Sequence, residues 1–438
     1  MIGRIAPAIL NAGRQPLVFG LVVGGFVLYF LYHVTRFRLT NFWPQFGAFG
    51  DASILFEISR KVFALGDYPA RLAAGTMNQV FPYPPPAVVL FDVLGAAGAG
   101  AFMAAWLVFM LAGLLVSLRA SFGGERSEMT AAWPLAAAIA LIFADSPVAW
   151  DLRNANSNLV CLGLVLGAFA LTDKRPALAG VLIGLGISIK LFGILLLPWL
   201  LWRGPRKALI AALVTLALLW LVLPAAIFGI EGTIRLYAGW REQLRIISDP
   251  WIYSFIQAGV GPPLVSVRRA AMTLTGQGPE ATATLAAVAG LWAIWIAGLA
   301  WYALRAVRTR GVRAPSRAAL ADWTVLLLAP LPFSPWLEPY HAAPIVPGLV
   351  LCVVLALDVG LEARERIAAL LGLAAFAAIR LGGVPFTIRA IGILAGFLVL
   401  VVVLGFLRPR LAAAPQTEPE HALMRTAPRA RPARARHS

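Results

Sequence analysis

The sequence Phe49-Gly50-Asp51-Ala52-Ser53 opens a stretch that closes on Phe81-Pro82-Tyr83-Pro84-Pro85-Pro86, and the rest of the chain is organised around it. The stretch begins with a carboxylate soon after the first long apolar segment, and its prolines come just before the next one. We interpret it as a folded outer loop at a membrane surface. Residues 52–65 have the composition of a helix, and Asp51 stands where a helix cap would.

The composition excludes a soluble globular protein. Of the 438 residues, 60% are hydrophobic and only 13% are charged, and the mean hydropathy is +0.81. A surface in contact with water needs more charge than this. Crossing a bilayer takes about 20 apolar residues, and a continuous helix satisfies all of its backbone polar groups within lipid. The sequence therefore predicts an all-α polytopic membrane protein.

The net charge of +17 does not indicate a nucleic-acid surface. Arginine and lysine occur in short clusters between apolar runs and in the tail, which is typical of cytoplasmic membrane loops. Cys161 and Cys352 lie inside apolar runs, so we expect buried thiols.

The basic clusters set the expected orientation, because short cytoplasmic loops are enriched in lysine and arginine. We place on the cytoplasmic side residues 172–175, 203–207, 305–317 and 364–366, together with the tail. The outward segments are then residues 51–86, 145–158, the turn near Lys190, and residues 231–279, 334–344 and 380–389.

This alternation predicts a bundle of about 12 transmembrane helices. Residues 16–32 form a signal anchor, 86–96 a partly inserted helix before a crossing at 99–118, and 177–202 a hairpin with Lys190 near its tip. The other crossings are expected near 131–147, 159–171, 208–229, 283–304, 320–333, 345–358, 367–379 and 389–407.

The bundle forms one domain over residues 1–407. It carries a first outer loop at about residues 36–86, with short helices, and an outer amphipathic loop at about residues 230–279. Residues 408–438 are rich in alanine, proline and arginine, and we expect a disordered basic cytoplasmic tail there.

Carboxylates close to a membrane are costly, so Asp51 is the first candidate for chemistry. It can serve as a helix cap, as a general base, or as both. Glu57 and Asp67 stand in the same loop and are alternative bases. Asp51 ranks first because it lies nearest the exit of the first helix.

Lys190 is the second candidate. Lys190 has apolar neighbours and lies at a hairpin tip. Its side chain could extend to the outer membrane interface and have no further role, or it could bind an anionic headgroup or phosphate. The third candidate is the polar run 151–158. Asn156 or Asn158 could cap the next helix, whereas amides beside Arg153 would also suit a sugar-phosphate pocket.

His341 is the fourth candidate. A single histidine is more often structural than catalytic. Its neighbours Glu338, Trp336 and Tyr340 favour a sugar site, because aromatic faces and hydrogen-bonding groups suit a sugar ring.

Together these segments resemble the GT-C membrane glycosyltransferases, and among them the polyprenol-phosphate-mannose-dependent mannosyltransferases of glycosyltransferase family 87. The resemblance covers about residues 47–344. It rests on Asp51, Gly66-Asp67-Tyr68-Pro69, Tyr83-Pro84-Pro85, Asn154-Ala155-Asn156-Ser157-Asn158, Ile189-Lys190-Leu191 with Pro198, and Ser334-Pro335-Trp336 with His341. The family's usual Gly-Gln-x-Asn run is replaced here by residues 154–158, and Leu-Phe-Gly follows Lys190.

The resemblance implies inverting transfer of mannose or another hexose from a polyprenyl-phosphate donor to an acceptor hydroxyl. It implies Asp51 as the general base and Lys190 and Arg153 on the donor phosphate. His341, Asn156 and Asn158 would line the sugar pocket, and Tyr83 and Glu57 would be further substrate-binding residues. No metal or other cofactor is expected.

The implied partners are a polyprenyl-phosphate sugar donor, a glycolipid or glycan acceptor and membrane lipids, with no nucleic acid. The protein would be a multi-pass protein of the inner (plasma) membrane, acting in the cell envelope from the periplasmic or extracellular side. Two alternatives stay open: a polytopic transporter or lipid-linked sugar flippase, and a nonenzymatic assembly partner. A transporter would be expected to carry charges near the midplane of several helices.

Overall fold

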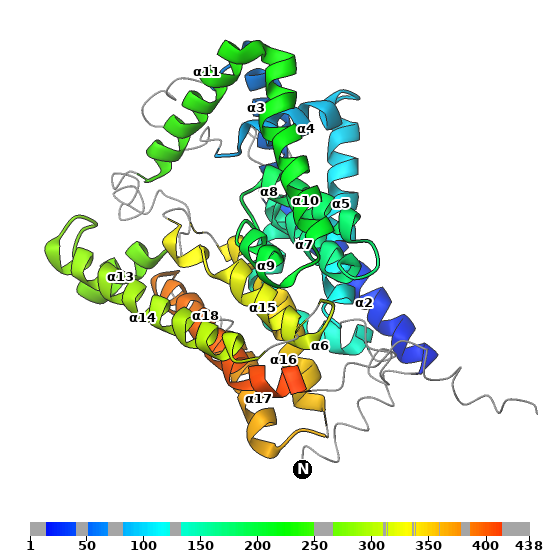
Figure 1. Ribbon diagram of the computed structural model, residues 1–438, viewed down its shortest axis with the longest axis vertical. Helices are drawn as coiled ribbons and strands as arrows, with labels where there is room; N and C mark the ends of the chain where they lie inside the picture. The colour runs from blue at the N-terminus through cyan, green and yellow to red at the C-terminus, as the bar shows by residue number, and fades with distance from the viewer. Residues whose placement is uncertain are drawn as a thin grey trace, which may run out of the picture.

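The computed structural model describes residues 15–40, 51–68, 82–122, 133–248, 266–309, 312, 314–334, 337, 339–358, 360–377 and 386–413. Within these ranges every regular element is a helix and no strand occurs, which confirms the all-α class (Figure 1).

The N-terminal half contains helices α2 (Pro16–Thr40), α3 (Asp51–Leu65), α4 (Pro85–Gly95), α5 (Ala99–Ala120), α6 (Trp133–Asn154), α7 (Asn158–Leu171), α8 (Pro176–Ile189), α9 (Leu196–Arg203) and α10 (Arg206–Ala217). The C-terminal half contains the π-helical η3 (Leu218–Val222), α11 (Leu223–Ser248), α13 (Val267–Thr275), α14 (Thr282–Val307), α15 (Arg317–Leu328), η4 (Leu331–Phe333), η5 (Pro339–Ala342), α16 (Ile345–Leu357), α17 (Ala363–Ala377) and α18 (Phe386–Ala413).

Prolines and glycines divide the apolar runs close to the expected positions. The predicted inserted helix and crossing correspond to α4 and α5, which are separated at Gly98, where φ is 97°. The predicted loop helix is α3, and it ends at Gly66, where φ is 64°. A left-handed backbone is easiest for glycine, so both breaks have a local cause.

Several expected boundaries differ from the structure, among them the end of the first helix, which is predicted at residue 32 and lies at Thr40. Helix α6 continues beyond residue 147 to Asn154, with an 80° bend between its two parts. Helix α18 continues to Ala413, so it includes residues 408–413 of the segment that we expected to be a disordered tail. Residues 414–438 lie outside the described ranges.

Four helices of the described chain are long and apolar enough to cross a membrane, and a fifth qualifies if the bent α6 is one span. The four are Ala99–Ala120, Arg206–Ser248, Thr282–Val307 and Ala390–Ala412. Five further apolar helices have 10–17 residues. The protein is thus a helical membrane protein, and the figure of about 12 crossings is not confirmed.

Glycines bring pairs of helices into backbone contact. A side chain at Gly163 of α7 would overlap the backbone of Gly113 in α5. Gly180 of α8 faces the Ala208 backbone of α10 in the same way, and Gly184 faces the Thr215 side chain. Small residues let membrane helices approach closely, so van der Waals contact and not side-chain bulk holds these pairs together.

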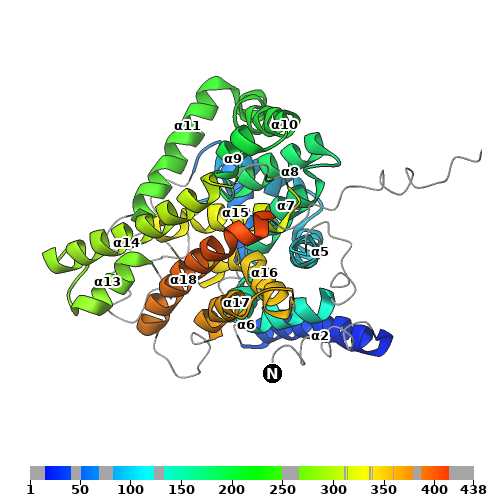
Figure 2. The same cartoon turned by 60° about the horizontal axis from the view of Figure 1, so that its bottom comes forward.

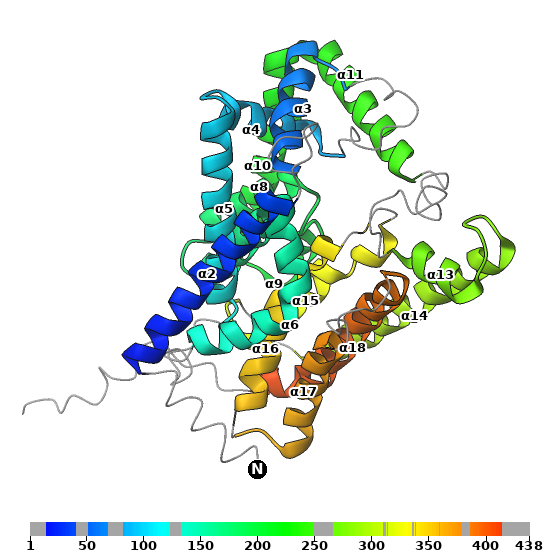
Figure 3. The ribbon, with the colours of Figure 1, turned by 180° about the vertical axis from the view of Figure 1, so that it is seen from behind.

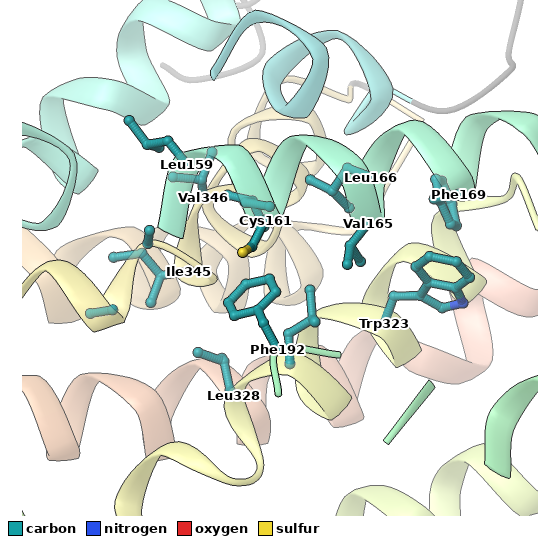
Figure 4. Close-up of a cluster of buried hydrophobic side chains, with 14 of the residues drawn as sticks. Leu159, Cys161, Val165, Leu166, Phe169, Phe192, Trp323, Leu328, Ile345 and Val346 are labelled. Atoms are coloured by element: carbon teal, nitrogen blue, oxygen red, sulfur yellow. The ribbon is translucent and has the colours of Figure 1, made fainter. Parts of the chain in front are cut away.

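Helix α7 lies at the centre of the buried core. Figure 4 shows Cys161 beside Phe192, and Phe169 near Trp323 of α15 at the other end of the helix. The rings of Phe169 and Trp323 are 5.2 Å apart. With 14 residues, α7 is about 20 Å long. Its N-terminus and its C-terminus therefore lie in two separate regions of the molecule.

Two other helix groups complete the fold. Figure 2 shows α14 crossing beside α18, with α13 packed against both. On the opposite side α2 lies along α6 (Figure 3), and the Tyr29 hydroxyl donates to Asp145 Oδ1 at 2.9 Å, next to the bend of α6.

A buried ion pair joins the last helix to the rest. Arg408 of α18, which is fully buried, donates to Asp322 Oδ1 and Oδ2 of α15 at 2.9 and 3.0 Å. Tyr302 of α14 donates to the same carboxylate at 2.8 Å, and Arg203 of α9 lies 3.4 Å away. Four helices therefore meet at the Asp322 carboxylate.

We expect Gly163→Leu to lower the free energy of unfolding by about 1–3 kcal/mol or more, because the new side chain must displace the α5 backbone. Thermal unfolding of the purified protein in detergent measures the effect. Gly290→Leu is the matched control, since a Cβ at Gly290 would meet nothing within 4 Å. Equal stability of the two variants would contradict the close approach of α5 and α7.

We expect Asp322→Asn to cost about 3–5 kcal/mol, because it leaves the buried Arg408 without its counter-charge. The exposed pair Glu242–Arg245 supplies the control. Glu242→Gln should cost less than about 1 kcal/mol in the same unfolding experiment. Similar losses in both variants would refute a special contribution from the buried pair.

Candidate active site

The site is built on the sharp turn between α6 and α7. Ala155 takes a left-handed backbone there, with φ of 49°. Its carbonyl accepts a hydrogen bond from Trp106 Nε1 of α5 at 2.9 Å, and the Asn156 N–H donates to the carbonyl of Asp151 at 3.1 Å. These two bonds stabilise a backbone conformation that is unfavourable for alanine.

Asp151 connects the two helices. Its side chain is fully buried, Oδ2 accepts the Leu159 N–H at 2.9 Å, and Oδ1 accepts Asn158 Nδ2 at 2.8 Å. A carboxylate is favourable at the N-terminus of a helix, where backbone N–H groups are unpaired. Asp151 therefore caps α7, a role that we had considered for Asn156 or Asn158.

Lys190 follows the last residue of α8 and points into this turn. Its Nζ donates to Asn158 Oδ1 at 2.9 Å and to Asn156 Oδ1 at 3.4 Å. A cation is favourable at a helix C-terminus. These two amide oxygens orient the ammonium group, and Asn158 links it to the buried Asp151 carboxylate.

Tyr83 lies against Lys190, which is bound by Asn156 and Asn158. The Lys190 Nζ lies 5.9 Å from the centre of its ring, and its hydroxyl is 3.0 Å from Ser157 Oγ. The Tyr83 carbonyl accepts the Tyr68 hydroxyl at 2.7 Å. Burial, with a smaller contribution from Tyr237, raises the pKa of Tyr68 well above its usual range, so the phenol stays protonated as a donor.

The structure thus brings together four of the predicted residues: Tyr83, Asn156, Asn158 and Lys190. We call them, with Asp151 and Ser157, the lysine cluster. They come from three segments that are distant in the sequence, and all three segments were predicted to face outward.

The other predicted residues belong to α6, η5 and α3. Arg153 is in the last turn of α6, two residues beyond Asp151. His341 is half-buried on η5, which packs against α6. Glu57 is exposed on α3. Asp51 is the first residue of α3, and its side chain is not among those that the structure describes. The side chains of Trp336, Glu338 and Tyr340 also lie outside the described part.

Sequence reasoning did not assign a role to Asp151, Ser157 or Tyr68. Asp151 and Ser157 belong to the polar run that we singled out, so their position was indicated, but not their partners. Tyr68 belongs to the quoted Gly66-Asp67-Tyr68-Pro69 motif. An aspartate that precedes a predicted helix by a few residues is the available signal for Asp151, because a carboxylate is favoured at a helix N-terminus.

The cluster can hold an anion. A fixed ammonium group, a tyrosine face and nearby hydroxyl and amide groups suit a phosphate ester, which needs both a cation and hydrogen-bond donors. In the described part of the chain, no group of three or more histidine, cysteine, aspartate and glutamate side chains is placed to hold a metal ion.

No curated protein and no solved structure matches the chain. The model of glycosyltransferase family 87 matches residues 81–330. The matched residues include the lysine cluster and Arg153, whereas Asp51, Glu57 and His341 lie outside them. Because this match spans more than half of the chain, the protein belongs to glycosyltransferase family 87 and is a membrane glycosyltransferase.

Proposed function

We propose that the enzyme transfers a hexose, with mannose as the first candidate, from a polyprenyl-phosphate donor to an acceptor hydroxyl with inversion. The observation that carries the proposal is the Lys190 ammonium held by Asn156 and Asn158 over the Tyr83 ring. Membership of a glycosyltransferase family makes the transporter, flippase and assembly-partner alternatives unnecessary.

Lys190 would bind the donor phosphate. When the bond between the anomeric carbon and the phosphate oxygen breaks, its electron pair goes to the oxygen, and the phosphate gains negative charge. A cation already in place stabilises that charge without reorganising. Arg153, in the last turn of α6, is the second candidate for the phosphate.

Asn158 would act mainly through Lys190. Asn158 uses Nδ2 on Asp151 and Asn156, at 2.8 and 2.9 Å, and Oδ1 on Lys190. We therefore propose that Asn158 positions the lysine and leaves sugar contacts to Asn156, His341 and Tyr83. This refines the expectation that both asparagines line the sugar pocket.

Asp51 remains our proposed general base, taking the proton of the acceptor hydroxyl as its oxygen attacks the anomeric carbon. Inversion requires attack from the side opposite to the phosphate, so the base must lie across the sugar from Lys190. Helix α3 begins at Asp51 and packs on α4 and α5, close to the segment that carries Tyr83. Glu57 and Asp67 are the alternatives.

The separation of polar groups along α7 supports chemistry on the outer side. The lysine cluster, made of segments predicted to face outward, lies at the N-terminus of α7. Trp323 packs against Phe169 near the C-terminus, next to Asp322 and Arg203, which comes from a segment predicted to be cytoplasmic. We propose an inner-membrane enzyme with a periplasmic site that receives a glycolipid or glycan acceptor.

We expect Lys190→Met to reduce transfer of labelled hexose from a polyprenyl-phosphate donor by at least about a hundredfold, because the leaving phosphate loses its cation. Lys174→Met is the matched control, since Lys174 is an exposed lysine in the turn between α7 and α8. It should transfer at the wild-type rate. Wild-type activity of a folded Lys190→Met protein would overturn the phosphate assignment.

We expect Asp51→Asn to lower the rate of transfer by about 10²–10⁴, the usual contribution of a general base. Glu57→Gln and Asp67→Asn, measured beside it at matched amounts of folded protein, should keep most of the activity. If one of these two loses activity while Asp51→Asn does not, the base is that residue and Asp51 is only a helix terminus.

A further inference from the structure

The returning arm of α11 lies outside the lysine cluster, yet it contacts the segment of Tyr83 directly and is linked through Trp220 to the helix that ends before Lys190. Helices α10, η3 and α11 follow one another without a break until Gly229, where φ is 70° and the chain bends. In Figure 1, α11 turns over at the top and runs back down, away from α10. We call residues 230–248 the α11 arm.

Trp220 connects this region to the helix that presents Lys190. Its Nε1 donates to Ser188 Oγ at 3.0 Å, and Ser188 lies two residues before Lys190 in the last turn of α8. Trp220 is part of the π-helical η3. A π turn changes the direction of side chains relative to an α-helix and is often found at functional sites. The indole therefore stabilises the turn that ends in Lys190.

Tyr237 of the α11 arm fixes Trp220 in turn. Its hydroxyl donates to the Trp220 carbonyl at 2.5 Å, and the two rings stack with centroids 6.1 Å apart. The contacts form a chain from the arm to the lysine: Tyr237 to Trp220, Trp220 to Ser188, and Ser188 to the last turn of α8, where Ser188 Oγ donates to the Gly184 carbonyl.

The same arm also holds the segment of Tyr83. Trp240 Nε1 donates to the Pro82 carbonyl at 2.9 Å. Gly239 lies so close to Tyr68 that a Cβ there would be 2.9 Å from the Tyr68 Cβ, and Tyr68 donates to the Tyr83 carbonyl. The α11 arm thus contacts the Tyr83 side of the lysine cluster directly and reaches the Lys190 side through Trp220.

We propose that Tyr237 and Trp220 are positioning residues for Lys190, and that the α11 arm sets the distance between Lys190 and Tyr83 at which the donor phosphate binds. The inference rests on the proposed function, because it takes Lys190 as the phosphate ligand. In this proposal the arm acts through Lys190 and Tyr83. It keeps the ammonium group in the position that the phosphate requires.

The test is a double-mutant cycle on binding of polyprenyl phosphate, measured with purified protein in detergent. Tyr237→Phe removes one hydroxyl and keeps the ring stack. We expect it to weaken binding by about three- to tenfold, the usual effect of one hydrogen bond. In a Lys190→Met background the same change should have almost no effect. In transfer assays Tyr237→Phe should raise the KM for the donor and leave the KM for the acceptor unchanged.

Two controls separate positioning from general stability. Tyr302→Phe makes the same chemical change in the distant Asp322 group, so it should lower the unfolding temperature and leave phosphate binding unchanged. Arg245 lies on the exposed face of the α11 arm, so Arg245→Gln should change neither the unfolding temperature nor phosphate binding. Ser188→Ala provides a second route to the cluster and should reproduce the effect of Tyr237→Phe.

The outcomes distinguish the two proposals. If Lys190→Met binds polyprenyl phosphate as wild type does, the phosphate role of Lys190 fails, whatever Tyr237→Phe does. If Lys190→Met binds weakly but Tyr237→Phe and Ser188→Ala bind normally, or weaken binding equally in both backgrounds, the positioning role fails and the phosphate role stands.

Discussion

The buried carboxylate of Asp151 is the constraint on which the site depends. One oxygen caps α7 and the other holds Asn158, whose own oxygen holds Lys190. A buried carboxylate is costly unless its oxygens are hydrogen-bonded. Both bonds to Asp151 must therefore be kept, and they fix the end of α6 relative to the start of α7 and to Asn158. The lysine position is therefore a consequence of how two helices meet. It does not depend on the flexible lysine side chain alone.

Much of the helical pattern could be predicted from the sequence. The segment expected to be helical at 159–171 is α7, observed at Asn158–Leu171, although it is among the apolar helices of 10–17 residues and its crossing is not confirmed. The helix expected at 52–65 is α3. These predictions succeeded because proline, glycine and charged residues end the apolar runs. Placing Lys190 at the end of a short helix also followed from the sequence, since Pro176 and the polar turn after residue 171 fix where α8 begins.

The partners of the polar groups could not be predicted. We took Pro147 as the end of a crossing, but α6 bends there and continues as a helix. That bend turns Asp151 toward α7, and nothing in the local sequence states its angle. The sequence places Arg408 in the tail because residues 408–438 are rich in alanine, proline and arginine. Its counter-charge, Asp322, lies 86 residues earlier in the sequence, which a local pattern does not reveal.

The Asp322 group also has a consequence for how the chain is made. Helices enter the membrane in order, and at about 5–20 residues per second the ribosome needs several seconds to synthesise the residues between α15 and the end of α18. During that interval Asp322 can pair with Arg203 and Tyr302, which are already present. Arg408 arrives last and makes the two shortest charged contacts. Completion of the final helix therefore closes the bundle, although the helix lies outside the region that matches the family.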